Sequence, residues 1–97
     1  MLDTLTKESF DPLKGDAFSL AHDGGTTLSL SLVAVLGTGL RGHASREQFA
    51  IHFLGPAIPV LPQRIYQLHH QQLGALEIFL VPIKRDANGT TYEAVFT

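Results

Sequence analysis

Apolar and polar residues alternate along much of the chain. Within residues 27–36 leucine alternates with serine and threonine as far as Leu32, and within residues 48–53 phenylalanine and isoleucine alternate with glutamine, alanine and histidine. A period of two gives a strand one apolar and one polar face, so both segments are predicted to be half-buried β-strands. Apolar, β-branched and aromatic content predicts further strands at residues 17–22, 65–70, 76–83 and 92–96.

The strand predicted near residue 50 has a helical alternative. Ser45 could cap a helix over residues 46–54, which Gly55-Pro56 would close. The alternation and the aromatic content of the segment favour the strand. Both interpretations stay open at the level of the sequence.

Glycine and proline mark the connections between the predicted strands. Asp-Gly-Gly at residues 23–25 is typical of a tight hairpin, residues 71–74 read as a second short loop, and Asn-Gly at residues 88–89 marks another turn. Residues 55–62 hold three prolines, which remove too many donors for a strand inside a ladder. They predict an extended, stiff connection.

Before the first strand, Thr6 is predicted to cap a single helical turn over residues 7–10, with Leu5 packing on Phe10. Pro12 should end this turn, because the residue before proline disfavours the helical region. Together these elements predict one mainly β domain over residues 1–97. Its expected form is a small antiparallel barrel or two-sheet roll of about six strands, with one short N-terminal helical turn.

Residues 37–42 contain a complete G-x-G-x-x-G. As a dinucleotide fingerprint this pattern needs a buried parallel strand before it, a helix after it and an acidic residue about 20 positions further on. The preceding strand alternates, and no Asp or Glu occurs between Glu47 and Glu77. We therefore expect no cofactor here, but a mobile, mildly basic loop over residues 37–46. Three of its side chains are candidates for binding a partner: Arg41, His43 and Arg46.

Residues 76–83 are apolar on both faces of the predicted strand, which requires cover on both sides. Either the barrel interior and the N-terminal turn cover the two faces, or a partner subunit does. A low charge and a two-faced apolar strand are typical of a self-associating or docking domain. Phe79 and Val81 therefore join the candidate partner-binding residues. Pro82, inside the run, predicts a sheet edge or a β-bulge.

Composition limits the partners. The 97 residues are 44% hydrophobic and only 16% charged, with a net charge of −2, and the basic residues are scattered. Neither nucleic acid nor an anionic membrane is therefore expected as a partner. No apolar run approaches the roughly 18 residues of a membrane span, and the acids near the N-terminus argue against a signal peptide. A soluble, cytoplasmic protein is expected.

Cysteine is absent, which excludes disulfides, thiolate metal sites and a cysteine nucleophile, but the chain has five histidines. His69 and His70 are adjacent in a predicted strand, so they point to opposite faces and cannot chelate one ion. The usual zinc spacings are also missing. His70 shares a face with Tyr66 and Leu68 and is expected to be partly buried, whereas His69 should face water. A metal site built from several histidines stays an alternative.

Serine, histidine and acidic residues can be combined into a triad, for example Ser45, His43 and Glu47, but no nucleophile turn surrounds any serine. Such a triad could be assembled from almost any chain. We therefore predict no catalytic residue, no cofactor and no metal ligand.

Several short motifs resemble a family of small bacterial proteins of about this length, the DUF6916 family of unknown function. The most specific run includes Leu73-Gly74, Phe-Leu-Val-Pro at residues 79–82 and Tyr-Glu-Ala-Val-Phe at residues 92–96. Other motifs lie at residues 5–10, 53–56, 60–63 and 66–70. The resemblance spans nearly the whole chain and excludes residues 37–42. It implies a structural or assembly role, because members tend to be encoded beside phage-tail-collar-like proteins, and it defines no catalytic residues.

These observations predict a non-enzymatic interaction or assembly protein that self-associates and belongs to a larger, phage-tail-like bacterial assembly as an accessory or structural component. The alternative is a small ligand-binding or enzymatic barrel with a pocket near four residues: Tyr66, His70, His52 and Tyr92. A buried polar pocket that holds at least two of these side chains would favour the alternative. A filled apolar interior would favour the interaction protein.

Overall fold

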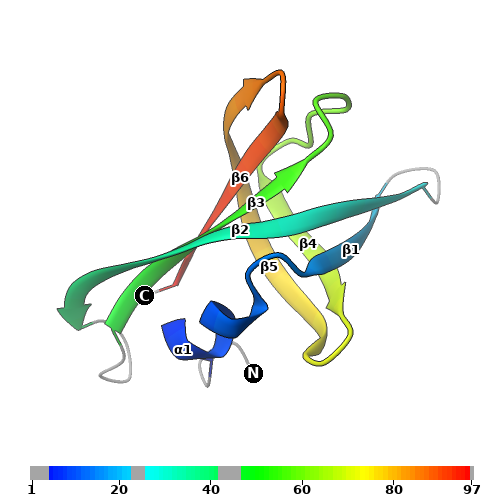
Figure 1. The fold of residues 1–97 in the computed structure, drawn as a ribbon. Coiled ribbons are helices and arrows are strands. Elements are labelled where there is room, and N and C mark those ends of the chain that lie inside the picture. Colours follow the sequence, from blue (N-terminus) through cyan, green and yellow to red (C-terminus); the bar gives the residue numbers. More distant parts are fainter. Residues whose placement is uncertain (1–4, 23–25, 42–46, 97) are drawn as a thin grey trace.

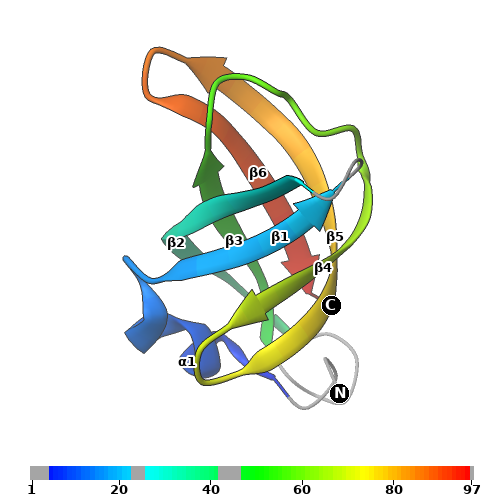
Figure 2. The same ribbon diagram turned by 90° about the vertical axis from the view of Figure 1, so that its right-hand side faces the viewer.

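The computed structural model describes residues 5–22, 26–41 and 47–96 and is mostly β (Figure 1). Six strands follow a short N-terminal helical segment: β1 (Ala17–His22), β2 (Thr26–Arg41), β3 (Glu47–Gly55), β4 (Arg64–His70), β5 (Gly74–Asp86) and β6 (Gly89–Phe96). Neighbouring strands are antiparallel and close a ring in the order β1-β2-β3-β6-β5-β4 (Figure 2). The prediction of a mainly β fold with about six antiparallel strands is confirmed, and the ring closes as a small barrel.

The alternation seen in the sequence sorts the side chains between the interior of the ring and its outside. On β3, Phe49, Ile51 and Phe53 have no exposed surface, while the residues between them are partly exposed. The helical alternative for this segment is wrong, since a helix would spread these three side chains around its axis instead of burying them together. The interior is filled by apolar side chains from every strand: Phe18, Leu20, Leu30, Leu32, Phe49, Ile51, Phe53, Tyr66, Leu68, Leu76, Ile78, Leu80, Tyr92, Ala94 and Phe96.

The N-terminal segment forms α1 (Lys7–Phe10), followed by the 3₁₀ turn η2 (Asp11–Leu13). The backbone N–H of Thr6 donates to Ser9 Oγ at 3.0 Å, which satisfies one of the free donors at the start of the turn. The predicted helical turn is confirmed. The hydrogen bond from Lys7 Nζ to Asp11, together with the charge of that carboxylate, raises the pKa of Lys7 above its usual 10.5.

α1 lies at one end of the ring (Figure 1), and its last residue, Phe10, is its buried one. Its ring is fully buried and lies 5.9 Å from Phe49 and 5.5 Å from Phe96, measured between centroids. Phe49 and Phe96 stack on each other at 4.7 Å. Three aromatic rings therefore close the barrel where β3 begins and β6 ends, and they contribute packing beyond the area they bury.

The proline-rich residues 56–63 form neither helix nor strand and connect β3 to β4 at the opposite end of the ring (Figure 1). Two buried tyrosines hold this connection. The Leu61 N–H donates to the hydroxyl of Tyr92 at 2.9 Å, and the hydroxyl of Tyr66 donates to the Pro62 carbonyl. Backbone groups of the connection are thus hydrogen-bonded to tyrosine side chains of the barrel.

The register between β5 and β6 shifts between Pro82 and Lys84. β5 pairs with β4 only as far as Leu80, so Pro82 has a ladder partner on the β6 side alone, where it opposes Tyr92. The prediction of a sheet edge or a β-bulge at Pro82 is confirmed, since Pro82 is paired on one side only and lies beside the register shift.

Candidate functional site

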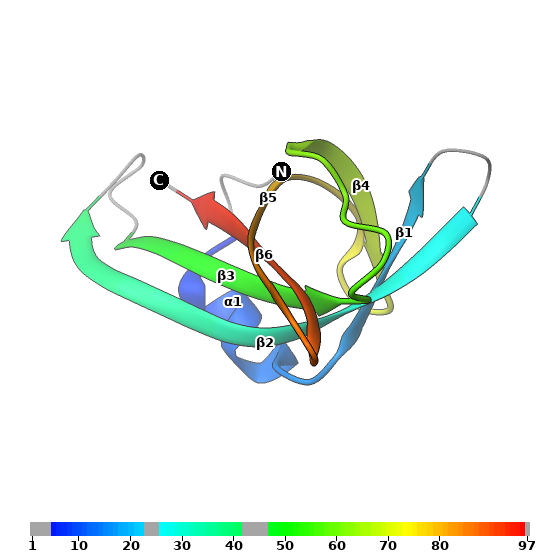
Figure 3. The same cartoon turned by 90° about the horizontal axis from the view of Figure 1, so that it is seen from above.

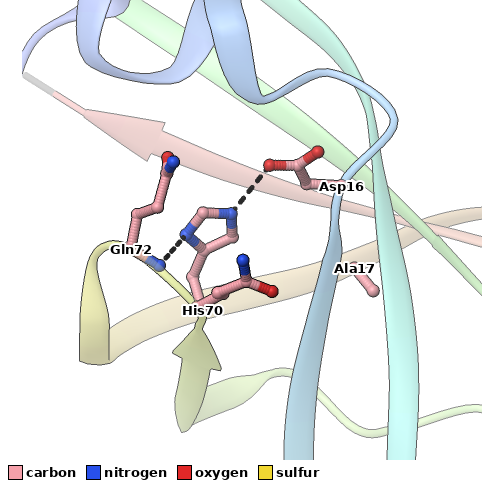
Figure 4. A pocket seen from close by; sticks show the side chains of 5 residues that line it. Asp16, Ala17, His70 and Gln72 are labelled. Carbon is pink, nitrogen blue, oxygen red and sulfur yellow. Dashed lines mark hydrogen bonds and ion pairs between the residues drawn. The ribbon is translucent and has the colours of Figure 1, made fainter.

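A polar corner of the described structure is built around His70 (Figure 4). The alternation of β4 turns Tyr66, Leu68 and His70 inward, and His70 is the last residue of the strand. Its side chain is 2% exposed and its ring lies 4.6 Å from the ring of Phe18. The expectation that His70 is buried and that His69 faces outward is confirmed.

Both ring nitrogens of His70 are engaged (Figure 4). Nδ1 accepts hydrogen bonds from the backbone N–H groups of Gln72 and Leu73, at 3.0 and 3.2 Å. An accepting Nδ1 assigns the ring proton of the neutral imidazole to Nε2, which then donates to Asp16 Oδ2 at 2.9 Å. His70 therefore ties the β4–β5 hairpin to the start of β1, and neither nitrogen is left to take a proton from a substrate.

A hollow of about 320 Å³ opens beside this corner, lined by Asp16, Ala17, His70, Gln71 and Gln72. Asp16 is half-exposed at its mouth. None of the lining side chains is a nucleophile of the serine, cysteine or lysine type, and the imidazole is already used by the protein. The lining carboxylate, Asp16, is hydrogen-bonded to His70, so the hollow is a polar corner whose two titratable side chains bind each other.

The four residues of the alternative pocket lie in three separate places. Tyr66 and Tyr92 hold the connection at one end of the ring, whereas His70 binds Asp16 at the other. His52 alternates with buried neighbours on β3 and lies on the outside, where its Nε2 is 3.0 Å from Glu93 Oε2. The described structure does not bring these four side chains together.

The glycine-rich segment differs from its prediction. Residues 37–41 continue β2 and pair with β3, from Gly37 opposite Phe49 to Arg41 opposite Glu47, with a register shift between them. The expected loop over residues 37–46 is therefore wrong for residues 37–41, because pairing with β3 orders a backbone that the glycines alone would leave free. His43 and Arg46 lie outside the described residues, and only the backbone of Arg41 is described.

An acidic side chain occupies the position that a phosphate would need in this segment. Gly39 has a φ of +78°, and its N–H donates to Glu47 Oε2 at 2.9 Å. A side chain at Gly37 would collide with the same carboxylate and with the stem of Lys7. A phosphate would meet a negative charge here, so the segment is a strand that binds Glu47 and has no free anion cradle.

The outside of the ring carries a row of apolar side chains that crosses five strands. We call this row the outer band. Leu36 on β2 pairs with Ala50 on β3, which pairs with Val95 on β6, and Phe79 on β5 pairs with Ile65 on β4. The pairing of β5 with β6 begins where Val81 opposes Glu93, two residues along each strand from Phe79 and Val95. Leu36, Val95, Phe79 and Ile65 are 49%, 63%, 48% and 65% exposed, respectively.

A second row runs beside the outer band on the same face. It contains Ala34 on β2, His52 on β3, Glu93 on β6 and Val81 on β5, which are opposed in that order. The His52–Glu93 contact is the polar centre of an otherwise apolar patch, and both side chains are partly buried. The predicted partner residues Phe79 and Val81 both belong to this face, Phe79 half-exposed and Val81 partly covered. Composition and alternation alone did not indicate that Leu36 and Val95 would join them, because that depends on the order of the strands.

A family model described as a domain of unknown function, DUF6916, matches residues 5–96. The chain belongs to this family. The match begins at Leu5, just before α1, and ends at Phe96, so it covers the whole ring and confirms the family resemblance of the sequence motifs. No curated protein and no solved structure matches the chain.

Two further findings concern the described part of this DUF6916 member. No three His, Cys, Asp or Glu side chains within it are grouped closely enough to hold a metal ion. Its helical segments are also too short to cross a membrane.

Proposed function

We propose that this protein is a non-enzymatic interaction or assembly component, which docks onto a protein partner through the outer side of the neighbouring strands β6 and β5. The observation that carries the proposal is the outer band. Large apolar side chains, among them Val95 on β6 and Phe79 on β5, stand exposed or half-exposed on the outside, although the interior of the ring is already filled. A contiguous apolar patch on a small domain is typical of a protein interface.

The polar corner of the fold favours the same proposal over an enzymatic barrel. His70 uses both of its nitrogens to hold backbone and Asp16 in place, and the hollow beside it lacks a nucleophile. Self-association and a phage-tail-like setting stay predictions: the first rests on the low charge and the two-faced strand, and the second on the family resemblance.

Charge introduced into the outer band tests the proposal. In an extract of cells that naturally make the protein, the wild type should elute from a gel-filtration column as part of a complex larger than the free chain. A double variant with Phe79→Glu and Val95→Glu should elute as the free chain, because burying two carboxylates against an apolar partner is costly.

Ile58→Glu is the control, because Ile58 is 74% exposed on the connection after β3 and lies off the outer band. This variant should elute with the wild type. Retention of the large complex by the double variant, with its fold verified by circular dichroism, would contradict the proposal.

A further inference from the structure

We propose that His70 is a pH-sensitive latch for the turn between β4 and β5, which holds the turn while its imidazole is neutral and releases it when Nδ1 takes up a proton. The turn is residues 71–73, which join His70 at the end of β4 to Gly74 at the start of β5. Histidine is the side chain that ordinarily changes its charge between about pH 5 and pH 8. The inference uses no residue of the outer band and is independent of the proposed function.

The latch is the lone pair of His70 Nδ1. It accepts hydrogen bonds from the backbone N–H groups of Gln72 and Leu73, at 3.0 and 3.2 Å (Figure 4). A proton on Nδ1 occupies this lone pair and turns the acceptor into a donor. Three N–H groups would then point toward one another where water cannot separate them, because the side chain is 2% exposed. A protonated Nδ1 and the turn as it stands therefore exclude each other.

The other ring nitrogen keeps its partner through the change. Nε2 donates to Asp16 Oδ2 at 2.9 Å in the neutral ring, and it donates in the same way when the ring is charged. The imidazole therefore stays anchored at Asp16 when a proton arrives. The part that has to give way is the turn.

The groups around the imidazole come from four segments. Among the described residues, Asp16 is the charged group in contact with the ring, from the segment before β1. β1 contributes the uncharged ring of Phe18, the turn contributes its backbone N–H groups, and β5 opposes His70 with Gly74. The carboxylate favours a proton on the ring, and the two backbone donors oppose it. Protonation and the conformation of the turn are thus coupled directly.

The structure leaves the turn room to move. The hollow of about 320 Å³ lies beside it and is lined by Gln71 and Gln72, which are both exposed. Gly74 follows the turn with a φ of +76°, and a Cβ at this position would have open space around it. Glycine passes between conformations that other residues avoid, so the backbone can pivot there.

Release of the turn affects one end of the barrel. The side chain of Leu73 is partly buried and packs against the core, and its N–H is one of the two that Nδ1 holds. A turn that leaves the imidazole therefore loosens this apolar contact as well. The strands themselves stay neighbours in the ring, because β4 and β5 pair continuously as far as Arg64 opposite Leu80 (Figures 2 and 3).

Two events should coincide in the wild-type protein as the pH is lowered from neutral until the barrel unfolds. Nitrogen-15 NMR detects the proton on His70 Nδ1, and hydrogen exchange follows the amides of Gln72 and Leu73 in the same samples. Corrected for the intrinsic pH dependence of exchange, both amides should exchange at least about tenfold faster once Nδ1 is protonated, because they have lost their acceptor. The amide of Ile51 should keep its protection, because β3 is paired on both sides there.

His70→Asn separates the titration from the hydrogen bonds. The carbonyl oxygen of asparagine accepts hydrogen bonds as Nδ1 does but takes up no proton in this range, so exchange at Gln72 and Leu73 should lose its pH response. His69→Asn is the matched control, since it removes the exposed imidazole one residue earlier on β4 and should keep the wild-type response. Circular dichroism establishes that each variant folds. The wild-type measurement decides by itself if His70→Asn does not.

Three results would overturn the latch. The first is a proton on Nδ1 with unchanged exchange at Gln72 and Leu73, and the second is an imidazole that stays neutral for as long as the barrel is folded. The third is a folded His70→Asn variant that keeps the wild-type pH response. None of these results bears on the docking of Phe79 and Val95, so the latch and the proposed function fail separately.

Discussion

At the scale of single residues, His70 joins two parts of the chain that are distant in sequence, its own hairpin and the segment before β1. Its imidazole receives two backbone N–H groups of the β4–β5 hairpin and donates to Asp16, which precedes β1. A buried imidazole is tolerated because every polar atom on it has a partner. The arrangement fixes the tautomer and the position of the hairpin together.

Replacement of His70 should therefore destabilise the fold. His70→Ala leaves two backbone donors and a cavity behind, and we expect a loss of about 2–4 kcal/mol in the free energy of unfolding, measured with urea. His69→Ala, one residue earlier on the exposed face, should change it by less than about 0.5 kcal/mol. Nitrogen-15 NMR of the wild type should find the proton of His70 on Nε2. A proton on Nδ1 would contradict the hydrogen bonds described.

The two tyrosine hydroxyls should differ in what their removal costs. Tyr92→Phe leaves the buried N–H of Leu61 without its acceptor, and we expect a loss of about 1–3 kcal/mol, with faster hydrogen exchange at the Leu61 amide. Tyr66→Phe frees the carbonyl of Pro62, an exposed residue, which water can reach instead. It should cost less. Equal losses of unfolding free energy in the two variants would contradict the argument that the exposure of the freed backbone group sets the cost.

At the scale of elements, the length of β2 depends on the strands with which it pairs. Its first half pairs with β1 and its second half with β3, and the glycine-rich residues 37–41 belong to the second half. Gly39 reaches a left-handed φ inside the irregular part of that pairing, where its N–H contacts Glu47.

Substitution of Gly39 tests this conformation. A Cβ at Gly39 would have open space around it, so the expected cost of Gly39→Ala is that of the backbone alone, about 1 kcal/mol in the free energy of unfolding. Gly39→Asn should cost less, because asparagine adopts the left-handed region more readily. The measurement is urea unfolding of the two variants beside wild type. Identical stability of all three would contradict a left-handed Gly39.

Local sequence patterns predict most of these elements, because alternation, capping and turn chemistry act within a few residues. The helical turn at residues 7–10, the hairpin at residues 71–74, the β-bulge at Pro82 and the burial of His70 were all predictable in this way. The continuation of β2 through Gly37 was not, since glycine favours no strand by itself and the partner strand imposes the order. Only Phe79 of the outer band and Val81 of the row beside it were predictable, because which other residues neighbour them depends on the order of the strands.

At the scale of the whole molecule, a closed ring leaves few ways for this protein to meet a partner. The ring closes through two residue pairs between β1 and β4, and β2 changes its partner from β1 to β3 along its length. The interior is filled, so an internal cavity is not the main feature offered to a partner. The outer band and the row beside it remain, as a half-exposed apolar face on a chain with few charges. The family match covers this whole ring and assigns no activity.

The proposed docking face, which carries Phe79 and Val95, is tested most directly by hydroxyl-radical footprinting. The protein is labelled once inside the complex that it forms in its native extract and once as the dilute isolated chain. The account predicts that labelling of Phe79 and Val95 falls strongly in the complex, while Ile58, exposed but off the face, is labelled equally in both samples. Undiminished labelling of Phe79 in the complex would contradict the docking face.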